Sequence, residues 1–215
     1  MLHISTADKL ALFETGPLIR ADGSRKSITA ETCIHYLRFD RADYETLGHL
    51  IKCNPAIKDP ADRDAPIGAL AEDVIDVLAT DHAPHTLEEK ARPDTSASSG
   101  LPLVEYALNA ALEPVHEGRL STAPVVQKFV HAPAQLFDVA GRGFLREGCA
   151  ADLVLVDDTA FTVRHEDALS KCGWSPFEGR TFHSRTASTW VNGVLGGDGS
   201  RLVGSPQGQR LAFVR

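Results

Sequence analysis

The side chains most able to do chemistry in this sequence follow the short apolar run 77–79. Asp81, His82 and His85 come directly after that run. A short apolar segment is typical of a strand buried on both faces of a parallel sheet, and α/β barrels carry their catalytic groups at the C-terminal ends of such strands. An Asp/His turn after a strand is also a common structural feature, so this stretch needs support from others of the same kind.

Three further segments place a polar side chain where a predicted strand ends. His3 lies in the apolar stretch 2–5, His35 ends the stretch 27–35, and Asn54 ends the stretch 50–54. The separations between these residues and Asp81 fit successive strand–helix units, since one βαβ repeat takes about 30 residues. Four strands that each bring one polar side chain to the same end of a sheet make half of a (β/α)8 barrel.

His3, His35 and Asp81 offer nitrogen and oxygen ligands of the kind that suits Zn²⁺. A bound zinc ion activates water near neutral pH and polarises a carbonyl group. A carboxylate beside the ion can take a proton from that water and pass it to a leaving nitrogen. Asn54 and His85 are placed to hydrogen-bond a substrate. The common spacing favours this interpretation over isolated structural histidines.

The composition excludes several other classes of protein. The chain has 215 residues, of which 43% are hydrophobic and 24% charged, as in a soluble globular protein. A net charge of −7 without a basic run argues against a nucleic-acid partner. No apolar run reaches the roughly 20 residues that span a membrane, and the N-terminus lacks a secretory pattern. The four cysteines form no C-x-x-C pair, which favours reduced thiols in the cytoplasm.

The elements that would position the site alternate between strands and helices up to about residue 140. Helices are predicted over residues 43–49, 59–72, 104–112, 122–130 and 131–137. After Gly141 the pattern changes to strands, at 151–157 and 187–191, and a turn follows at Asn192-Gly193. The sequence therefore predicts an α/β fold in two parts. Residues 1–140 form part of a TIM (β/α)8 barrel, and residues 141–215 form a small β-rich subdomain.

Several stretches resemble consecutive signature blocks of the dihydroorotases, a family of the amidohydrolase superfamily. Four of them are 2–7 (LHISTA), 31–37 (ETCIHYL), 52–58 (KCNPAIK) and 79–85 (ATDHAPH). The Asp-His-Ala-Pro-His block is close to diagnostic within that superfamily. The stretch Ser99–Pro102 also resembles the substrate-contacting loop of the family. A less specific match, residues 148–155, is similar to the superfamily's C-terminal strand.

The resemblance implies a role for each candidate residue. The implied metal ligands are His3, His35 and Asp81, and Asp81 is also the implied general base and acid. The implied substrate-binding residues are Asn54, His85, Gly100, Leu101 and Pro102. The implied reaction is the reversible, zinc-dependent hydrolysis of (S)-dihydroorotate to N-carbamoyl-L-aspartate in de novo pyrimidine (UMP) biosynthesis. The family's zinc centre is binuclear.

The sequence departs from the family pattern in its metal site. The His-x-His pair of the first barrel strand, the arginine that follows it and the bridging ligand of the fourth strand are absent from these 215 residues. The chain therefore resembles the C-terminal half of a dihydroorotase, about strands five to eight of the barrel. We expect a fragment with an incomplete zinc site and little or no turnover alone. Its expected protein partner is a separate N-terminal half or a second copy of the chain.

Two alternatives stay open from the sequence. Another cyclic amidohydrolase, such as an allantoinase or a hydantoinase, would use the same chemistry, but the block 81–85 disfavours it. A non-catalytic dihydroorotase-like chain could instead act as a scaffold for a partner such as aspartate transcarbamoylase. The missing His-x-His pair fits a scaffold. The presence of His3, His35 and Asp81 does not, because a scaffold has no chemical need for them.

Overall fold

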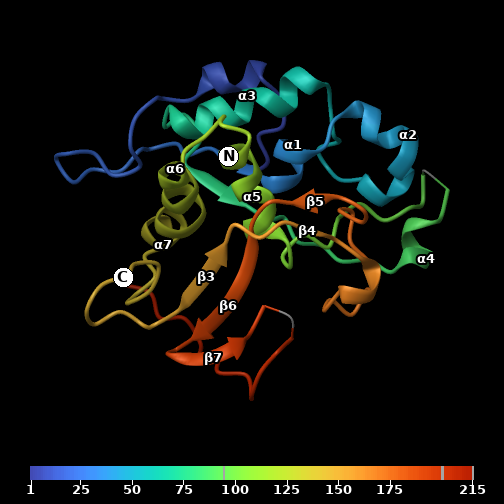
Figure 1. Cartoon of the computed structure of the whole chain (residues 1–215). Coiled ribbons are helices and arrows are strands. Elements are labelled where there is room, and N and C mark those ends of the chain that lie inside the picture. Colours follow the sequence, from blue (N-terminus) through green and yellow to red (C-terminus); the bar gives the residue numbers. More distant parts are fainter. Residues whose placement is uncertain (94, 200, 215) are drawn as a thin grey trace.

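The computed structural model describes residues 1–93, 95–199 and 201–214. Its α-helices are α1 (Ile34–Arg38), α2 (Tyr44–Leu47), α3 (Pro60–Ala71), α4 (Leu87–Lys90), α5 (Ala107–His116), α6 (Thr122–Val126) and α7 (Ala132–Leu136). Its strands are β1 (Glu31–Cys33), β2 (Val77–Ala79), β3 (Leu153–Asp157), β4 (Phe161–Thr162), β5 (Thr181–Phe182), β6 (Arg185–Val191) and β7 (Val194–Gly197). Figure 1 shows most of the helices on one side of the molecule and the sheet of β3, β6 and β7 on the other.

Strands β1 and β2 form a parallel pair at the centre of the helical part, with Thr32 opposite Leu78. The start of the chain runs beside β1, because the Ile4 amide donates to the carbonyl of Glu31. On the far side of β2, a parallel bridge joins His82 to Leu101. Four extended segments therefore lie side by side, in the order 1–5, β1, the β2 segment and the Leu101 segment. The α/β class is confirmed, whereas the half-barrel stays a prediction because only two of these segments are paired strands.

Of two strand predictions near the site, one holds in part and one is wrong. The predicted strand 27–35 is a strand only over Glu31–Cys33. His35 lies in the first turn of α1, because the buried run that follows β1 packs as a helix. A short apolar run cannot by itself be assigned to a strand or a helix. The stretch 50–54 is not a strand either. Its first part belongs to a 3₁₀ helix over Gly48–Ile51, and the Lys52 carbonyl then accepts a hydrogen bond from the amide of Gly100.

The helical predictions place the elements correctly and their ends approximately. Helix α3 lies within the predicted stretch 59–72 and begins at Pro60, a residue that suits a first helical position. The predicted helix 104–112 begins later, at Ala107, and continues to His116. The predicted helix 122–130 is an α-helix, α6, that continues as one π-helical turn over Gln127–His131. Short apolar patterns thus identify helices better than they locate the ends.

The main hydrophobic core includes residues from both parts of the predicted division. Phe177 and Phe182 are buried in the same cluster as Phe39 and Leu78. The Phe39 and Phe177 rings stack with their centroids 5.2 Å apart. Aromatic pairs at such distances contribute beyond the area that they bury. The division at residue 140 stays a prediction, and it does not coincide with a boundary of this core.

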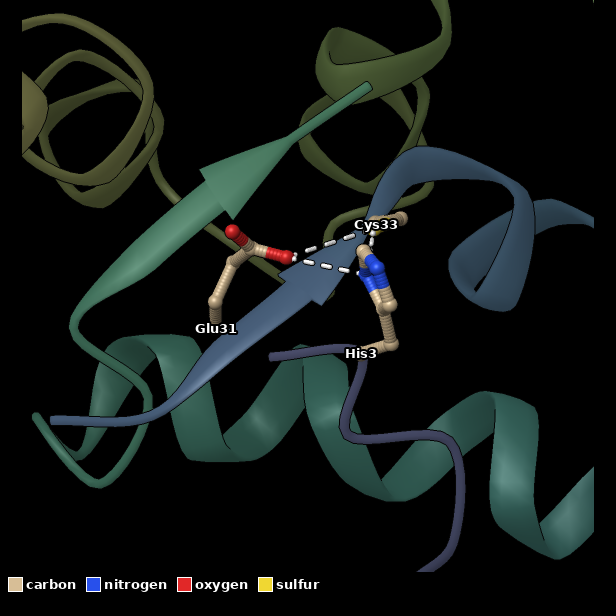
Figure 2. Close-up of side chains that lie close together, drawn as sticks. All are labelled: His3, Glu31 and Cys33. Carbon is tan, nitrogen blue, oxygen red and sulfur yellow. Dashed lines mark hydrogen bonds and ion pairs between the residues drawn. The ribbon is translucent and has the colours of Figure 1, made fainter. Parts of the chain in front are cut away.

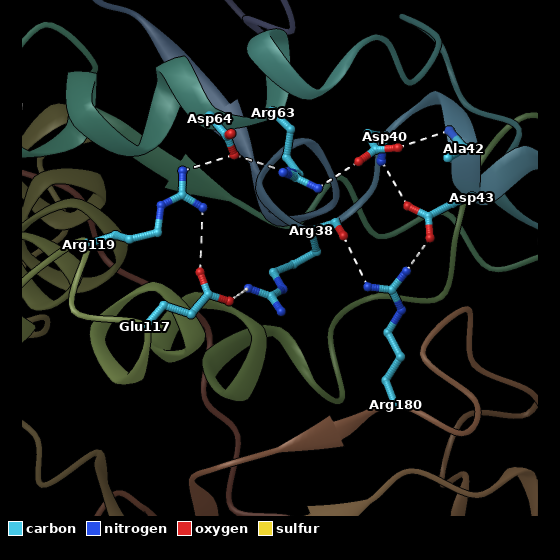
Figure 3. Close-up of polar contacts among 9 residues, drawn as sticks. All are labelled: Arg38, Asp40, Ala42, Asp43, Arg63, Asp64, Glu117, Arg119 and Arg180. Carbon is cyan, nitrogen blue, oxygen red and sulfur yellow. Dashed lines mark hydrogen bonds and ion pairs between the residues drawn. The ribbon is translucent and has the colours of Figure 1, made fainter.

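Arginine side chains connect the segments around this core (Figure 3). Arg180, from the stretch before β5, pairs with Asp43 and donates to the carbonyl of Arg38 at 3.1 Å. The other links are Arg38 to Glu117, Arg119 to Asp64, and Arg63 to both Asp64 and Asp40. The network therefore joins α1, α3 and α5 to a segment from beyond residue 141.

The tail contains the predicted strands. β6 pairs with β3 on one side and with β7 on the other, in antiparallel fashion. The turn between β6 and β7 has positive φ at Asn192 and Gly193, as a tight hairpin turn of this sequence type requires. No helix in the part of the chain that the structure describes is long and apolar enough to cross a membrane.

Candidate active site

His3 and Asp81 come together at the C-terminal ends of the central segments. The His3 Nε2 atom lies 3.8 Å from the Asp81 Oδ1 atom, and both side chains are about one-third exposed or less. Both residues have backbone φ in the left-handed region, at 57° and 48°. Such values are uncommon outside glycine and cluster at functional sites. The structure thus brings two of the three predicted metal ligands to one place, with room for access from solvent.

His35 is fully buried, and neither of its ring nitrogens has a hydrogen-bond partner in the protein. Burial, together with the nearby charge of His3, lowers the pKa of His35 to about 3. The imidazole is therefore neutral at physiological pH, which is the form that binds a metal ion. Buried polar atoms almost always have partners, so two orphaned nitrogens need an explanation. A metal ion that His35 would share with His3 fits this donor set.

Glu31 and Cys33 complete a cluster with His3 that the sequence analysis missed (Figure 2). The His3 Nδ1 atom lies 3.1 Å from the Glu31 Oε1 atom and 3.2 Å from the Cys33 Sγ atom. Glu31 and Cys33 are two positions apart on β1, so their side chains share one face of the strand. The sequence signal that could have identified this cluster was the two-residue spacing of Glu31 and Cys33 in a predicted strand next to the one that carries His3.

The chemistry of this cluster favours a positioning role for Glu31. Burial raises the pKa of the Cys33 thiol, and the negative charges of Glu31 and Asp81 raise it further. The thiol therefore holds its proton and is a poor metal ligand as it stands. A histidine that ligates a metal usually donates its other ring N–H to a carboxylate. Glu31 can accept from Nδ1 of His3 in this way and leave Nε2 directed toward Asp81.

The predicted substrate-binding residues lie on three segments that meet. The Asn54 side-chain amide donates to the Ser99 hydroxyl at 3.2 Å. A Cβ atom on Gly100 would lie 2.6 Å from the Cβ of Ala83 and 3.3 Å from the His85 ring. Gly100 therefore has to be glycine for this approach. Asn54, His85 and Gly100 thus lie in one region, with Asn54 exposed and Gly100 buried.

Leu101 and Pro102 continue from Gly100 as a buried stretch beside the block 81–85. The Ala83 amide donates to the Leu101 carbonyl at 3.0 Å. The His82 Nδ1 atom accepts from the backbone amide of Leu103 at 3.1 Å. His85 is held from another side, because its carbonyl accepts a 2.7 Å hydrogen bond from the buried Trp174 indole. The backbone that follows Asp81 is therefore fixed from two directions.

Comparisons with known proteins extend this picture. A dihydroorotase from Halobacterium salinarum is 41% identical over 175 residues, and the match covers 81% of this chain and 41% of that protein. A dihydroorotase from Pyrococcus furiosus is 30% identical over 210 residues, which are 97% of this chain and 47% of that protein. This chain is a homologue of the dihydroorotases. It spans less than half the length of these relatives. No protein-family model matches the chain.

Solved structures of cyclic amidohydrolases share the fold of this dihydroorotase homologue. The L-hydantoinase (dihydropyrimidinase) from Arthrobacter aurescens superposes with a TM-score of 0.84 at 26% identity, over 94% of this chain and 45% of that one. The inactive dihydroorotase-like domain of a Chaetomium thermophilum CAD-like multifunctional protein superposes with a TM-score of 0.65 at 20% identity, over 96% and 53%. The second likeness concerns the fold alone.

Proposed function

We propose that this chain supplies the C-terminal half of a dihydroorotase active site. The reaction is the reversible hydrolysis of dihydroorotate to N-carbamoyl-aspartate. The observation that carries the proposal is the buried, unpartnered imidazole of His35, together with the His3–Asp81 pair. The 41% and 30% identity to dihydroorotases favours this substrate over that of the hydantoinase, which is 26% identical. The free state of all four cysteines agrees with a reducing compartment such as the cytoplasm.

In the proposed mechanism His3, His35 and Asp81 hold zinc, and Glu31 keeps the His3 ring in place. The zinc, when bound, supplies Lewis-acid activation of water and of the ring carbonyl. The Asp81 carboxylate accepts a proton from the water that adds to the ring amide carbonyl carbon. It then returns that proton to the ring nitrogen as the carbon–nitrogen bond breaks. The reverse sequence closes the ring.

Asn54, His85 and the backbone of Gly100 to Pro102 hold the substrate in this proposal. Their segments meet in the structure, and the close approach of Gly100 to Ala83 leaves little freedom for rearrangement. Substrate binding in a fixed orientation lowers the entropic cost of the reaction. These residues therefore determine where the ring amide lies relative to Asp81.

The proposed enzyme needs groups that the described chain does not contain. The chain spans 41% and 47% of the two relatives, and it carries no His-x-His pair. An N-terminal half like that of these relatives is the proposed source of those ligands. The lack of His-x-His also favours one other function, a non-catalytic scaffold for a partner enzyme such as aspartate transcarbamoylase. The unpartnered His35 favours the enzyme, because a scaffold gains nothing from such a side chain.

The test measures zinc content and dihydroorotate turnover of the purified chain, with and without the N-terminal half of a homologous dihydroorotase. We expect turnover to require mixing, and we expect Asp81→Asn to abolish it while the mixture still forms. An Asp64→Asn variant, changed at a half-exposed member of the network of Figure 3, is the matched control. Absence of both zinc and turnover in the mixture would contradict the proposal and favour the scaffold. Hydrolysis of a hydantoin in preference to dihydroorotate would correct the substrate.

A further inference from the structure

Lys90 is the last residue of α4, and its side chain is completely buried. Its Nζ atom donates to the backbone carbonyls of Lys52, Ser98 and Gly100 at 3.0, 3.1 and 2.9 Å. An ammonium group has three donors, so these three carbonyls satisfy all of them. A cation is thus enclosed by neutral oxygen atoms, a few residues after the candidate catalytic block.

The three carbonyls belong to the two segments that carry substrate-binding residues. Lys52 lies two positions before Asn54, and Gly100 opens the stretch that ends at Pro102. The Lys52 carbonyl accepts from the Gly100 amide at 2.9 Å as well as from Lys90. The Asn54–Ser99 hydrogen bond makes a further connection between the same segments. Lys90 therefore lies at the junction of the Asn54 segment and the Gly100–Pro102 segment.

A buried ammonium group is costly, since it loses its hydration and has no carboxylate among these three partners. Burial accordingly lowers the pKa of Lys90 to about 8. Among its neighbours, Cys53 opposes this shift and Lys52 adds to it. A methionine of similar length would fill the space without that cost, but it would donate no hydrogen bond. What the lysine contributes is the connection between the two segments.

The helix that carries Lys90 is capped at its N-terminus. Thr86 and Glu89 form a capping box at the start of α4, in which each side chain bonds to the backbone amide of the other residue. This box follows His85 directly, so the helix that carries Lys90 is fixed to the end of the block 81–85. The Lys90 side chain thereby connects all three candidate substrate-binding segments, which carry Asn54, His85 and Gly100–Pro102.

We propose that Lys90 is a positioning residue that holds the Asn54 segment and the Gly100–Pro102 segment in a single arrangement. The ammonium group does not touch the substrate in this inference. It keeps Asn54 and the Gly100–Pro102 backbone at a constant separation, so that both can contact one small carboxylate-bearing substrate. The second part of this inference rests on the proposed function, whereas the first concerns the chain alone.

The experiment compares the purified chain with its Lys90→Met and Lys128→Met variants. Lys128 is also buried, but it pairs with Asp73, which lies outside the candidate substrate-binding segments. The Gly100 amide donates to the Lys52 carbonyl, so its hydrogen exchange reports the contact between the two segments. The Ala83 amide donates to the Leu101 carbonyl, so its exchange reports the contact of the Gly100–Pro102 segment with the block 81–85, and exchange at Val77 reports the central sheet. Removing the three hydrogen bonds should accelerate exchange at Gly100 and Ala83 by about tenfold to a hundredfold. Exchange at Val77, and all three sites in Lys128→Met, should stay near wild type.

Unchanged exchange at Gly100 and Ala83 in Lys90→Met would overturn the inference. If that variant does not fold, Lys90→Arg serves instead, because it keeps the charge but not the short reach of the ammonium. In the mixture with an N-terminal half, Lys90→Met should raise KM for dihydroorotate about tenfold and change kcat less, since the two displaced segments bind the substrate less tightly. An equal fall of kcat and kcat/KM would overturn the positioning role. If the mixture shows no turnover at all, the proposed function is wrong. The exchange data on the chain alone still test the positioning role of Lys90.

Discussion

The two ring nitrogens of His3 face different groups, and this difference leads to a prediction about zinc. Nδ1 lies 3.1 Å from a Glu31 carboxylate oxygen, and Nε2 faces Asp81 at 3.8 Å. If Glu31 orients His3, Glu31→Gln should weaken zinc binding by about tenfold to a hundredfold, as carboxylate partners of ligating histidines do. Competition titrations of the purified chain with a chromophoric chelator measure the change.

Cys33→Ser is the matched control for that titration, because Cys33 is the other neighbour of Nδ1. It should leave zinc affinity unchanged, and cobalt in place of zinc should show no thiolate charge-transfer band. A large loss of affinity in Cys33→Ser would mean that Glu31, Cys33 and Nδ1 bind the ion directly. The assignment of Nε2 to the metal would then be wrong.

Gly100 and Gly68 differ in what a methyl group would meet. At Gly100 the added Cβ would lie 2.6 Å from Ala83, and φ is +133°. At Gly68, inside α3, nothing lies within 4 Å. Gly100→Ala should therefore destabilise the chain by at least about 1–3 kcal/mol, whereas Gly68→Ala should stabilise it by up to about 1 kcal/mol. Urea unfolding measures both, and equal effects would contradict the close packing at Gly100.

The candidate site residues could be selected from the sequence, but their neighbours could not. His3, Asp81 and His85 stand out because a polar residue after an apolar run is a local signal. The partnership of Glu31 with His3 depends on two segments that are adjacent only in the fold. The absence of partners around His35 depends on packing by distant parts of the chain, which no local pattern encodes.

At the scale of elements, a buried ion pair connects the starts of β1 and β2. The Asp76 carboxylate accepts from Lys26 Nζ and from the Ala30 amide, both at 2.9 Å. Asp76→Asn would leave the Lys26 charge buried without its partner, which should cost about 3–5 kcal/mol of unfolding free energy. Chemical denaturation measures this cost.

An exposed ion pair provides the comparison for Asp76→Asn. Arg164 and Glu166 lie 3.3 Å apart with both side chains mostly exposed. Glu166→Gln should change stability by less than about 1 kcal/mol. A similar, small effect of both substitutions would show that the Lys26–Asp76 pair gains nothing from burial.

The elements themselves were predictable where the pattern is local. The β6–β7 hairpin follows from Asn192-Gly193, whose conformational preference selects the turn. Helix α3 follows from its length and from Pro60. The strand prediction for 50–54 failed because Leu50 and Ile51 also suit a 3₁₀ turn. The Lys52 carbonyl is then held by a hydrogen bond from the amide of the remote Gly100. Contacts of that range override local propensity.

At the scale of the whole molecule, Lys90 makes stability depend on pH. Its pKa is lowered from 10.5 to about 8 in the folded chain. Between these values the unfolded chain binds more protons than the folded one, so this group raises the unfolding free energy as the pH rises. The difference in unfolding free energy between wild type and Lys90→Met should therefore shift in favour of wild type from pH 8 to 10.5. Tyrosine and cysteine side chains with raised pKa values contribute equally to both proteins, so their contribution cancels when the two unfolding free energies are subtracted. A constant difference across that range would contradict the shifted pKa.

The outer strand of the tail sheet leads to a last prediction, about association. β3 is an edge strand, paired with β6 on one side. Leu153, Val154, Leu155 and Val156 are all exposed, by 36–57% of their surface. An apolar edge strand pairs readily with another strand, so the isolated chain should associate with itself as concentration rises. Leu155→Lys places a charge on that edge and should reduce association, as measured by analytical ultracentrifugation. Leu145→Lys, at an exposed loop residue, is the control, and equal effects of both would assign the association to another surface.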